Sequence, residues 1–191
     1  MANIHTKTIK RLADNLFAEM QTGLSAHLPW LDNAYGKADR VQRVINERRY
    51  YEPVWYVGND QYESLLPSQY NLGNYSFFVL NEPQTTDFQV WGQTSVTMPF
   101  SLIVWLDMRS VKNTYGDEYN TEAVKDDILR VLNGDIHTTA GVYTINRIWE
   151  RAENVFEGFN VDETDQQMMM SPYAAFRFTG ELIVKTICST N

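Results

Sequence analysis

The residue types that most often carry out catalysis or bind metal ions are few in this sequence. Its one cysteine, Cys188, lies near the end of the chain, and its three histidines, His5, His27 and His137, are far apart. Zinc sites need clusters of three or four cysteine, histidine or carboxylate ligands. A nucleophilic cysteine or serine needs a neighbouring base, and Cys188 follows a segment of strand character. The sequence therefore predicts neither a zinc site nor an activated nucleophile.

Phosphate-binding glycine motifs are also missing from the sequence. The P-loop has the pattern Gly-x-x-x-x-Gly-Lys-Ser/Thr, and the dinucleotide-binding loop has Gly-x-Gly-x-x-Gly, each between a strand and a helix. Neither spacing occurs among the 10 glycines of this chain. We therefore expect no cofactor.

Carboxylates are the remaining candidates for acid–base chemistry. Asp107, Asp117 and Glu118 follow the most apolar predicted strand, at a place where active sites often gather. Asp126 and Asp127 are neighbours on a predicted helix, so their side chains point about 100° apart, and acids favour the early turns of a helix. We expect that the protein is not an enzyme. Catalysis by scattered carboxylates stays as an alternative hypothesis.

Charge is distributed unevenly along the chain. The net charge is −8, which is unfavourable for a protein whose main partner is bare nucleic acid. Half of the lysines and arginines nevertheless lie in the first 50 residues, and four of them, Arg40, Arg43, Arg48 and Arg49, form a basic segment beside two tyrosines. This segment has three possible roles: a solvated face, a contact between subunits, or nucleic-acid binding. We expect no direct sequence-specific binding to nucleic acid.

An acidic segment over residues 150–171 is the counterpart of the basic segment. It ends in three methionines, which are typical either of adaptable contact surfaces or of core filling. If copies of the chain pack head to tail, the basic segment of one subunit faces the acidic segment of the next, and such a heterologous contact can close a ring. The candidate interface residues in the acidic segment are Glu153, Glu157, Asp162, Glu163, Asp165, Met168, Met169 and Met170.

Hydrophobic periodicity predicts two helices and a set of strands. Apolar residues spaced by three and four predict a helix over Thr6–Thr22 that stops at Gly23, and a second helix over Glu122–Leu132 that ends at Asn133-Gly134. The predicted strands are Arg40–Ile45, Pro53–Val57, Tyr75–Leu80, Val96–Asp107, Val142–Trp149 and Tyr173–Ile187. This order predicts an α+β fold with a mixed, mostly antiparallel sheet and both helices packed on it.

The length of 191 residues favours a single domain over 1–191. Within it we expect polar excursions near 58–74 and 81–95 and an acidic insertion near 150–171. The N-terminal segment has no signal-peptide pattern, and the longest apolar run, Pro99–Leu106, is far shorter than the ~20 residues that cross a bilayer. We expect a cytosolic compartment and no membrane partner.

The succession of elements resembles the tail-terminator and neck proteins of tailed bacteriophages. The resemblance lies in the N-terminal helix, the strand Phe100–Asp107, the helix Glu122–Leu132 and the final strand Tyr173–Ile187. It implies a virion structural protein of tail-terminator-like fold, assembled in the bacterial host cytoplasm, that forms a homo-oligomeric ring at the head-to-tail junction or tail end. The implied partners are further copies of the chain and other phage neck, connector or tail-tube proteins. The alternative is a monomeric cytosolic module that holds a ligand or peptide between aromatic residues such as Tyr62, Tyr70 and Trp91.

Overall fold

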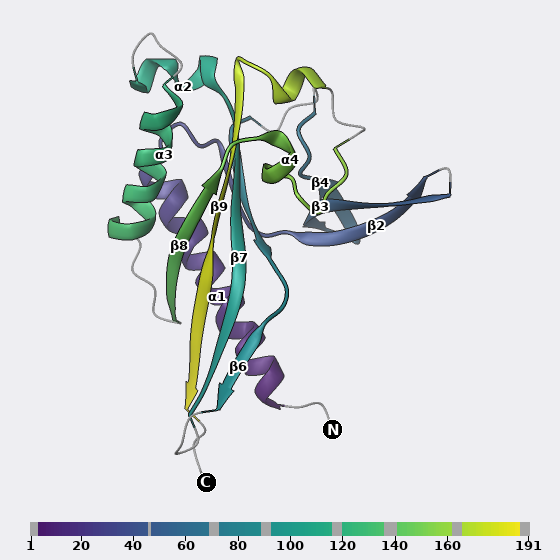
Figure 1. The fold of residues 1–191 in the computed structure, drawn as a ribbon, viewed down its shortest axis with the longest axis vertical. Coiled ribbons are helices and arrows are strands. Elements are labelled where there is room, and N and C mark those ends of the chain that lie inside the picture. Colours follow the sequence, from purple (N-terminus) through teal and green to yellow (C-terminus); the bar gives the residue numbers. More distant parts are fainter. Residues whose placement is uncertain are drawn as a thin grey trace.

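The computed structural model describes residues 4–45, 47–68, 73–88, 93–115, 120–135, 141–161 and 166–187. The chain has an α+β fold with a mixed, mostly antiparallel sheet, which confirms the predicted class (Figure 1). The helices are α1 (Ile4–His27), α2 (Met108–Tyr115), α3 (Thr121–Arg130) and α4 (Ala152–Val155), with a π-helical turn over Val131–Asp135 and a 3₁₀ turn over Gln166–Met169. The strands are β1 (Asn33–Lys37), β2 (Asp39–Ile45), β3 (Arg48–Gly58), β4 (Gln61–Ser64), β5 (Tyr75–Leu80), β6 (Thr85–Phe88), β7 (Gln93–Asp107), β8 (Val142–Trp149) and β9 (Tyr173–Ile187).

Two long antiparallel strands form the centre of the main sheet. Strands β7 and β9 pair along their whole length, from Gln93 opposite Ile187 to Asp107 opposite Tyr173. The strand order is β1-β5-β7-β9-β8, with β6 also paired to β7, and among the described strands only the β1–β5 pair is parallel. Residues 101–106 of β7 are all buried. The continuous apolar run in this strand is typical of a strand that is covered on both faces.

Helices α1 and α3 cover one face of this sheet. The buried stripe of α1 is Leu16, Met20 and Leu24, and Leu28, directly after the helix, continues it at the same spacing of four residues. Phe17 on α1 contacts the rings of Phe78 and Phe100 on the sheet. The predicted stop at Gly23 is wrong, because α1 continues to His27. Burying Leu24 and Leu28 outweighs the roughly 1 kcal/mol that a glycine costs inside a helix.

The opposite face has a second, smaller core at one end of the sheet only. Tyr75, Phe77 and Trp105 lie there beneath Phe156, which follows α4. The rings of Tyr75 and Trp105 stack with their centroids 5.6 Å apart. Met168 and Met169 are partly buried against this cluster, whereas Met170 is 64% exposed. Two of the three methionines thus contribute to core packing.

A separate three-stranded antiparallel sheet in the order β2-β3-β4 extends from the body, and its β2–β3 hairpin projects furthest (Figure 1). Strands β3 and β4 are joined by Asn59 and Asp60, both with φ near +55° (51° and 57°), as a two-residue hairpin turn requires. The predicted excursion near 58–74 therefore contains β4. The excursion near 81–95 contains β6 and the beginning of β7.

The second predicted helix also ends differently from the expectation. Asn120 caps α3 by accepting a hydrogen bond from the Ala123 N–H at 3.0 Å. The Asn133-Gly134 pair does not end the helical turns, which continue to Asp135 with π-type bonding. The Tyr143 hydroxyl donates to the Leu132 carbonyl, so a side chain from β8 satisfies one carbonyl of that last turn.

Among the described residues no helix is long and apolar enough to cross a bilayer.

Candidate functional site

The projecting hairpin, residues 39–58 of β2 and β3, is called the arm below. Two hydrogen bonds anchor its base to the body. The Arg40 guanidinium donates to the Gly158 carbonyl at 3.0 Å and lies 4.0 Å from the centre of the Tyr51 ring. The Asn160 N–H donates to the Tyr51 carbonyl at 3.0 Å. These bonds hold the arm at a fixed angle, because both of its strands are tied to the segment after α4.

The basic segment lies along the arm, but two of its arginines are engaged within the chain. Arg40 forms the contacts just described, and Arg43 Nε lies 3.0 Å from Glu52 Oε2 on the paired strand. Arg49 is exposed and forms no ion pair with a residue that the structure describes. The side chain of Arg48 lies outside the described part of the chain. The positive charge available to a partner is therefore at the outer half of the arm.

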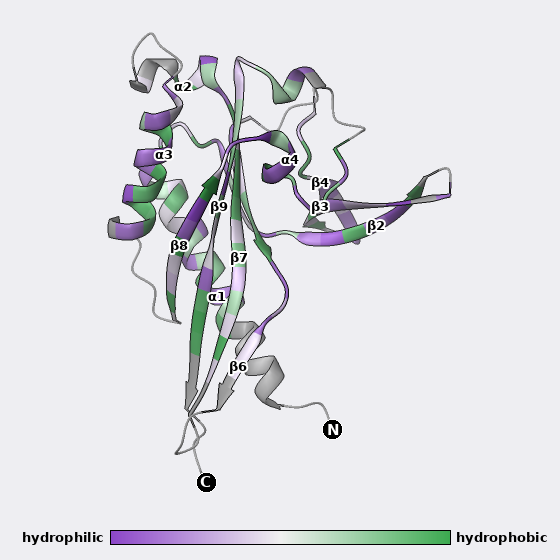
Figure 2. Ribbon diagram, in the orientation of Figure 1, coloured by the Kyte–Doolittle hydropathy of each residue, from purple (hydrophilic) through white to green (hydrophobic). Residues whose placement is uncertain are grey.

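Exposed apolar side chains gather on the same small sheet. Among the described residues, six large hydrophobic side chains are strongly exposed, and four of them lie on β2, β3 or β4. These four are Val44 (64% exposed), Tyr56 (48%), Val57 (52%) and Tyr62 (52%). The rings of Tyr56 and Tyr62 contact each other, with centroids 5.2 Å apart. Figure 2 shows hydrophobic residues interspersed with hydrophilic ones along β2. Such a grouping on a projecting element is typical of an interaction surface.

A groove of about 880 Å³ lies between the base of the arm, the open part of the main sheet and the segment after α4. Its floor comes from β9 and β8, and its walls come from the β1–β2 link, the end of β5 and the segment 157–159 after α4. Apolar side chains line part of it and are partly buried, among them Val79, Pro99, Trp149 and Phe159. The second core covers only the other end of this sheet face, which leaves the groove open.

Arg177 on β9 lies at the floor of the groove and is only 7% exposed. Its Nε donates to the Ser101 hydroxyl at 2.9 Å, and its Nη1 donates to the carbonyls of Asn154 and Glu157 at 3.3 and 3.1 Å. Burial lowers the pKa of this guanidinium, and the nearby Glu157 carboxylate acts in the opposite direction. Arg177 therefore ties α4 to the sheet rather than presenting its charge to a ligand.

The acidic segment lies beside the arm of its own chain. Glu153 on α4 is exposed, and the exposed Glu157 carboxylate lies 3.8 Å from Arg177 Nη1. The predicted residues Asp162, Glu163 and Asp165 lie outside the described residues. The basic and acidic segments thus meet within one subunit, at Arg40 and Gly158. Pairing between subunits remains a prediction for the charges that this contact leaves exposed.

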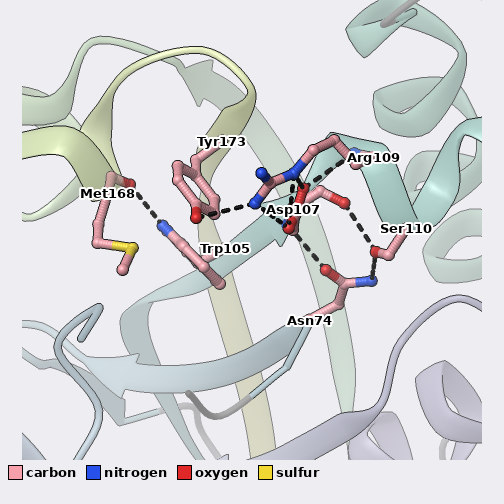
Figure 3. A network of polar contacts seen from close by, with 7 residues as sticks. All are labelled: Asn74, Trp105, Asp107, Arg109, Ser110, Met168 and Tyr173. Carbon is pink, nitrogen blue, oxygen red and sulfur yellow. Dashed lines mark hydrogen bonds and ion pairs between the residues drawn. The ribbon is translucent and has the colours of Figure 1, made fainter. Parts of the chain in front are cut away.

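A cluster of polar side chains lies apart from the groove, where β7 ends and α2 begins (Figure 3). Asp107 caps α2, because its carboxylate accepts from the Arg109 N–H at 2.9 Å and from the Arg109 side chain at 2.6 and 2.8 Å. Arg109 Nη2 also donates to the Tyr173 hydroxyl at 2.9 Å. The buried Asn74 amide accepts from the Asp107 N–H and donates to Ser110 Oγ. Every polar group of Asp107 thus has a structural partner, while Asp117 and Glu118 lie outside the described residues.

Asp107 should make stability depend on pH. The Arg109 side chain holds the pKa of this carboxyl below its ordinary value. Since the pKa is lower in the folded chain, the stabilisation is present above roughly pH 4 and is lost as the pH falls through the folded-state value. We expect Asp107→Asn to lose stability near neutral pH and to respond less than wild type to acid between roughly pH 5 and pH 2. Urea unfolding across that pH range measures the free energy of unfolding of both proteins, and Asp126→Asn at an exposed helix position is the control. Equal pH responses of wild type and Asp107→Asn would contradict the prediction.

Comparison with known proteins and the search for metal ligands bring no further assignment. No protein-family model matches the chain, and no curated protein is significantly similar to it. Among the described residues no group of three or more histidine, cysteine, aspartate or glutamate side chains could hold a metal ion.

Neither the groove nor the role of Arg177 was predicted from the sequence, although the sequence contains a signal for Arg177. Arg177 stands between Phe176 and Phe178 in a strand of alternating pattern, which places it on the face opposite two buried rings. A charged residue there must find partners if that face is covered. Tyr62, from the alternative ligand-binding hypothesis, lies on the small sheet beside Tyr56 and not in the groove, and Tyr70 and Trp91 lie outside the described residues.

Proposed function

We propose that the chain is a non-enzymatic virion structural protein that forms a homo-oligomeric ring at the neck or tail end of a tailed bacteriophage. The observation that supports this most is the arm, an anchored projection on whose sheet most of the strongly exposed hydrophobic side chains gather. Exposed apolar side chains cost free energy in water unless a partner covers them. A projecting element that leaves the groove of its own chain open suits contact with a different molecule.

The virion role follows from the resemblance in element order, together with the α+β fold and the charge distribution. In this proposal the ring is assembled in the bacterial host cytoplasm and then contacts connector or tail-tube proteins. The net charge of −8 suits contacts with proteins better than contacts with bare DNA. No membrane and no sequence-specific DNA contact is part of the proposal.

The proposed location can be tested on phage particles of the virus that encodes the chain. We expect mass spectrometry of purified virions to detect it, and gold-labelled antibodies against it to bind at the head-to-tail junction or at the tail end. A protein that is abundant in infected cells yet missing from purified virions would contradict the proposal. Labelling confined to the capsid surface would contradict the location.

The groove supports a second candidate function, a monomeric module that binds a small ligand or peptide. Its volume of about 880 Å³ is within the range of ligand sites. This function predicts that a ligand raises the unfolding temperature of the isolated chain, because a ligand that binds only the folded state stabilises it. A screen of metabolites and short peptides by thermal unfolding would show such a shift. A screen without any shift would favour the assembly function.

A further inference from the structure

We propose that the outer half of the arm of one copy docks in the groove of the next copy. This inference rests on the proposed ring-forming function and specifies which surfaces meet. The two surfaces differ, so the contact is heterologous and repeats around a ring. Three properties of the molecule support it: the charge of the arm, the charge of the groove, and the fixed position of the arm.

The outer half of the arm is basic and has an apolar residue. Residues 43–49 include Arg43, Arg48 and Arg49 against one acid, Glu47. Because Arg43 pairs with Glu52, the positive charge open to a partner comes from Arg48 and Arg49. Val44 lies opposite Arg49 in the β2–β3 register, so the two side chains share one face of the hairpin. Both are exposed, Val44 to 64%. This face therefore presents a cation beside an uncovered apolar group.

The groove has the complementary properties. Two of its cations are not open to a partner, because Arg177 is buried and Lys37 pairs with Asp14 at 3.3 Å. The exposed charged side chains of the lining are four acids and two cations, namely Asp39, Glu82, Glu157 and Glu181 against Arg40 and Arg147. The charges open to a partner are therefore mainly negative, and they lie beside the partly buried apolar side chains of the groove.

The arm cannot dock in the groove of its own copy. Asp39 and Arg40 at the base of the arm form part of the groove wall, and the bonds to Gly158 and Asn160 fix that base. The hairpin then runs away from the main sheet (Figure 1). A second copy is thus the occupant that the complementary charge favours, since every copy has both a basic tip and an acidic groove.

Two variants and their mixture test this docking. The arm variant carries Val44→Asp with Arg49→Glu, and the groove variant carries Glu181→Arg. We expect wild type to form a ring in sedimentation velocity, and each variant alone to weaken association at least ten-fold. Mixed together, they should form pairs of one copy each, because the intact arm of the groove variant meets the intact groove of the arm variant. Arg130→Glu on α3 is the matched charge control and should associate like wild type.

The outcomes distinguish this inference from the proposed function. If wild type forms rings and both variants assemble equally well, the docking is wrong while the ring-forming function stands. If both variants are monomeric and their mixture stays monomeric, the pairing of these two surfaces is also wrong. If wild type is itself monomeric at all concentrations, self-docking and ring formation fail together. Unchanged unfolding temperatures of the variants ensure that lost association does not reflect lost folding.

Discussion

The Gly180→Ala substitution is expected to destabilise the fold by about 3 kcal/mol, because it forces β8 away from β9. A Cβ at position 180 would lie 1.8 Å from the Thr144 carbonyl oxygen and 3.1 Å from the Phe100 ring. Cβ atoms essentially never approach another heavy atom this closely, the limit being about 3.0 Å, so the backbone of β8 must shift. Gly180 also lies next to a register shift in the β8–β9 pairing, between Ile145 and Arg147. The glycine therefore permits a close approach of two strands.

Denaturant unfolding of Gly180→Ala measures this effect, and amide hydrogen exchange in β8 should rise with it. The matched control is Glu181→Ala, which changes the next residue of the same strand at an exposed position. We expect the control to alter the free energy of unfolding by no more than about 0.5 kcal/mol. If Gly180→Ala were as stable as the control, the close approach of β8 and β9 would be disproved.

The second large effect is expected from Arg177→Met, which should cost about 3 kcal/mol. Methionine keeps an unbranched apolar stem in place of the aliphatic part of arginine but has no donor for the Asn154 and Glu157 carbonyls or for Ser101 Oγ. Unpaired polar groups in a buried place each cost roughly 1–3 kcal/mol. We also expect α4 to become more susceptible to proteolysis, because its main polar link to β9 is lost.

Arg147→Met on the adjacent strand is the matched control for this substitution. Arg147 is exposed, so its replacement should change stability by no more than about 0.5 kcal/mol. The midpoints of urea unfolding of the two variants give the comparison. Equal midpoints would mean that the buried guanidinium contributes nothing to the attachment of α4.

Long segments of regular hydrophobic pattern were predictable from the sequence. The predicted strands Tyr75–Leu80, Val142–Trp149 and Tyr173–Ile187 match β5, β8 and β9 in their bounds, because each combines apolar alternation with clear flanking residues. The Asn120 cap was predictable for the same local reason, since an asparagine side chain can bond the first free N–H groups of the helix that follows. The mixed sheet followed from the order of these elements.

The short and polar elements were not predictable. Strands β1, β4 and β6 have only four or five residues, and β1 is formed by pairing with β5, about forty positions along the chain. Helix α2 has eight residues and was not predicted, although the predicted strand end at Asp107 is confirmed and Asp107 also caps this helix. One local signal was available for β4, because Asn59-Asp60 is a favourable hairpin turn. Such short elements are stabilised by tertiary contacts, which the local pattern does not contain.

The candidate site was likewise predictable from the sequence only in part. The sequence identified the basic segment, including Arg40 and Arg49, and placed Glu157 in an acidic one. It could not show that Arg40 and Gly158 meet within one chain, because more than a hundred residues separate them. The groove likewise depends on residues from six strands and three connecting segments. Composition therefore indicates which charges exist, while only the fold determines which of them remain free for a partner.

Light scattering of the purified wild-type chain at two concentrations tests the ring-forming claim most directly, with negative-stain images of any large species. The predicted result is one particle whose mass is a fixed multiple of 22.2 kDa at both concentrations, and which appears as a closed ring in the images. A mass of 22.2 kDa at both concentrations would contradict the claim. Open filaments of variable length would contradict closure while still indicating a heterologous contact.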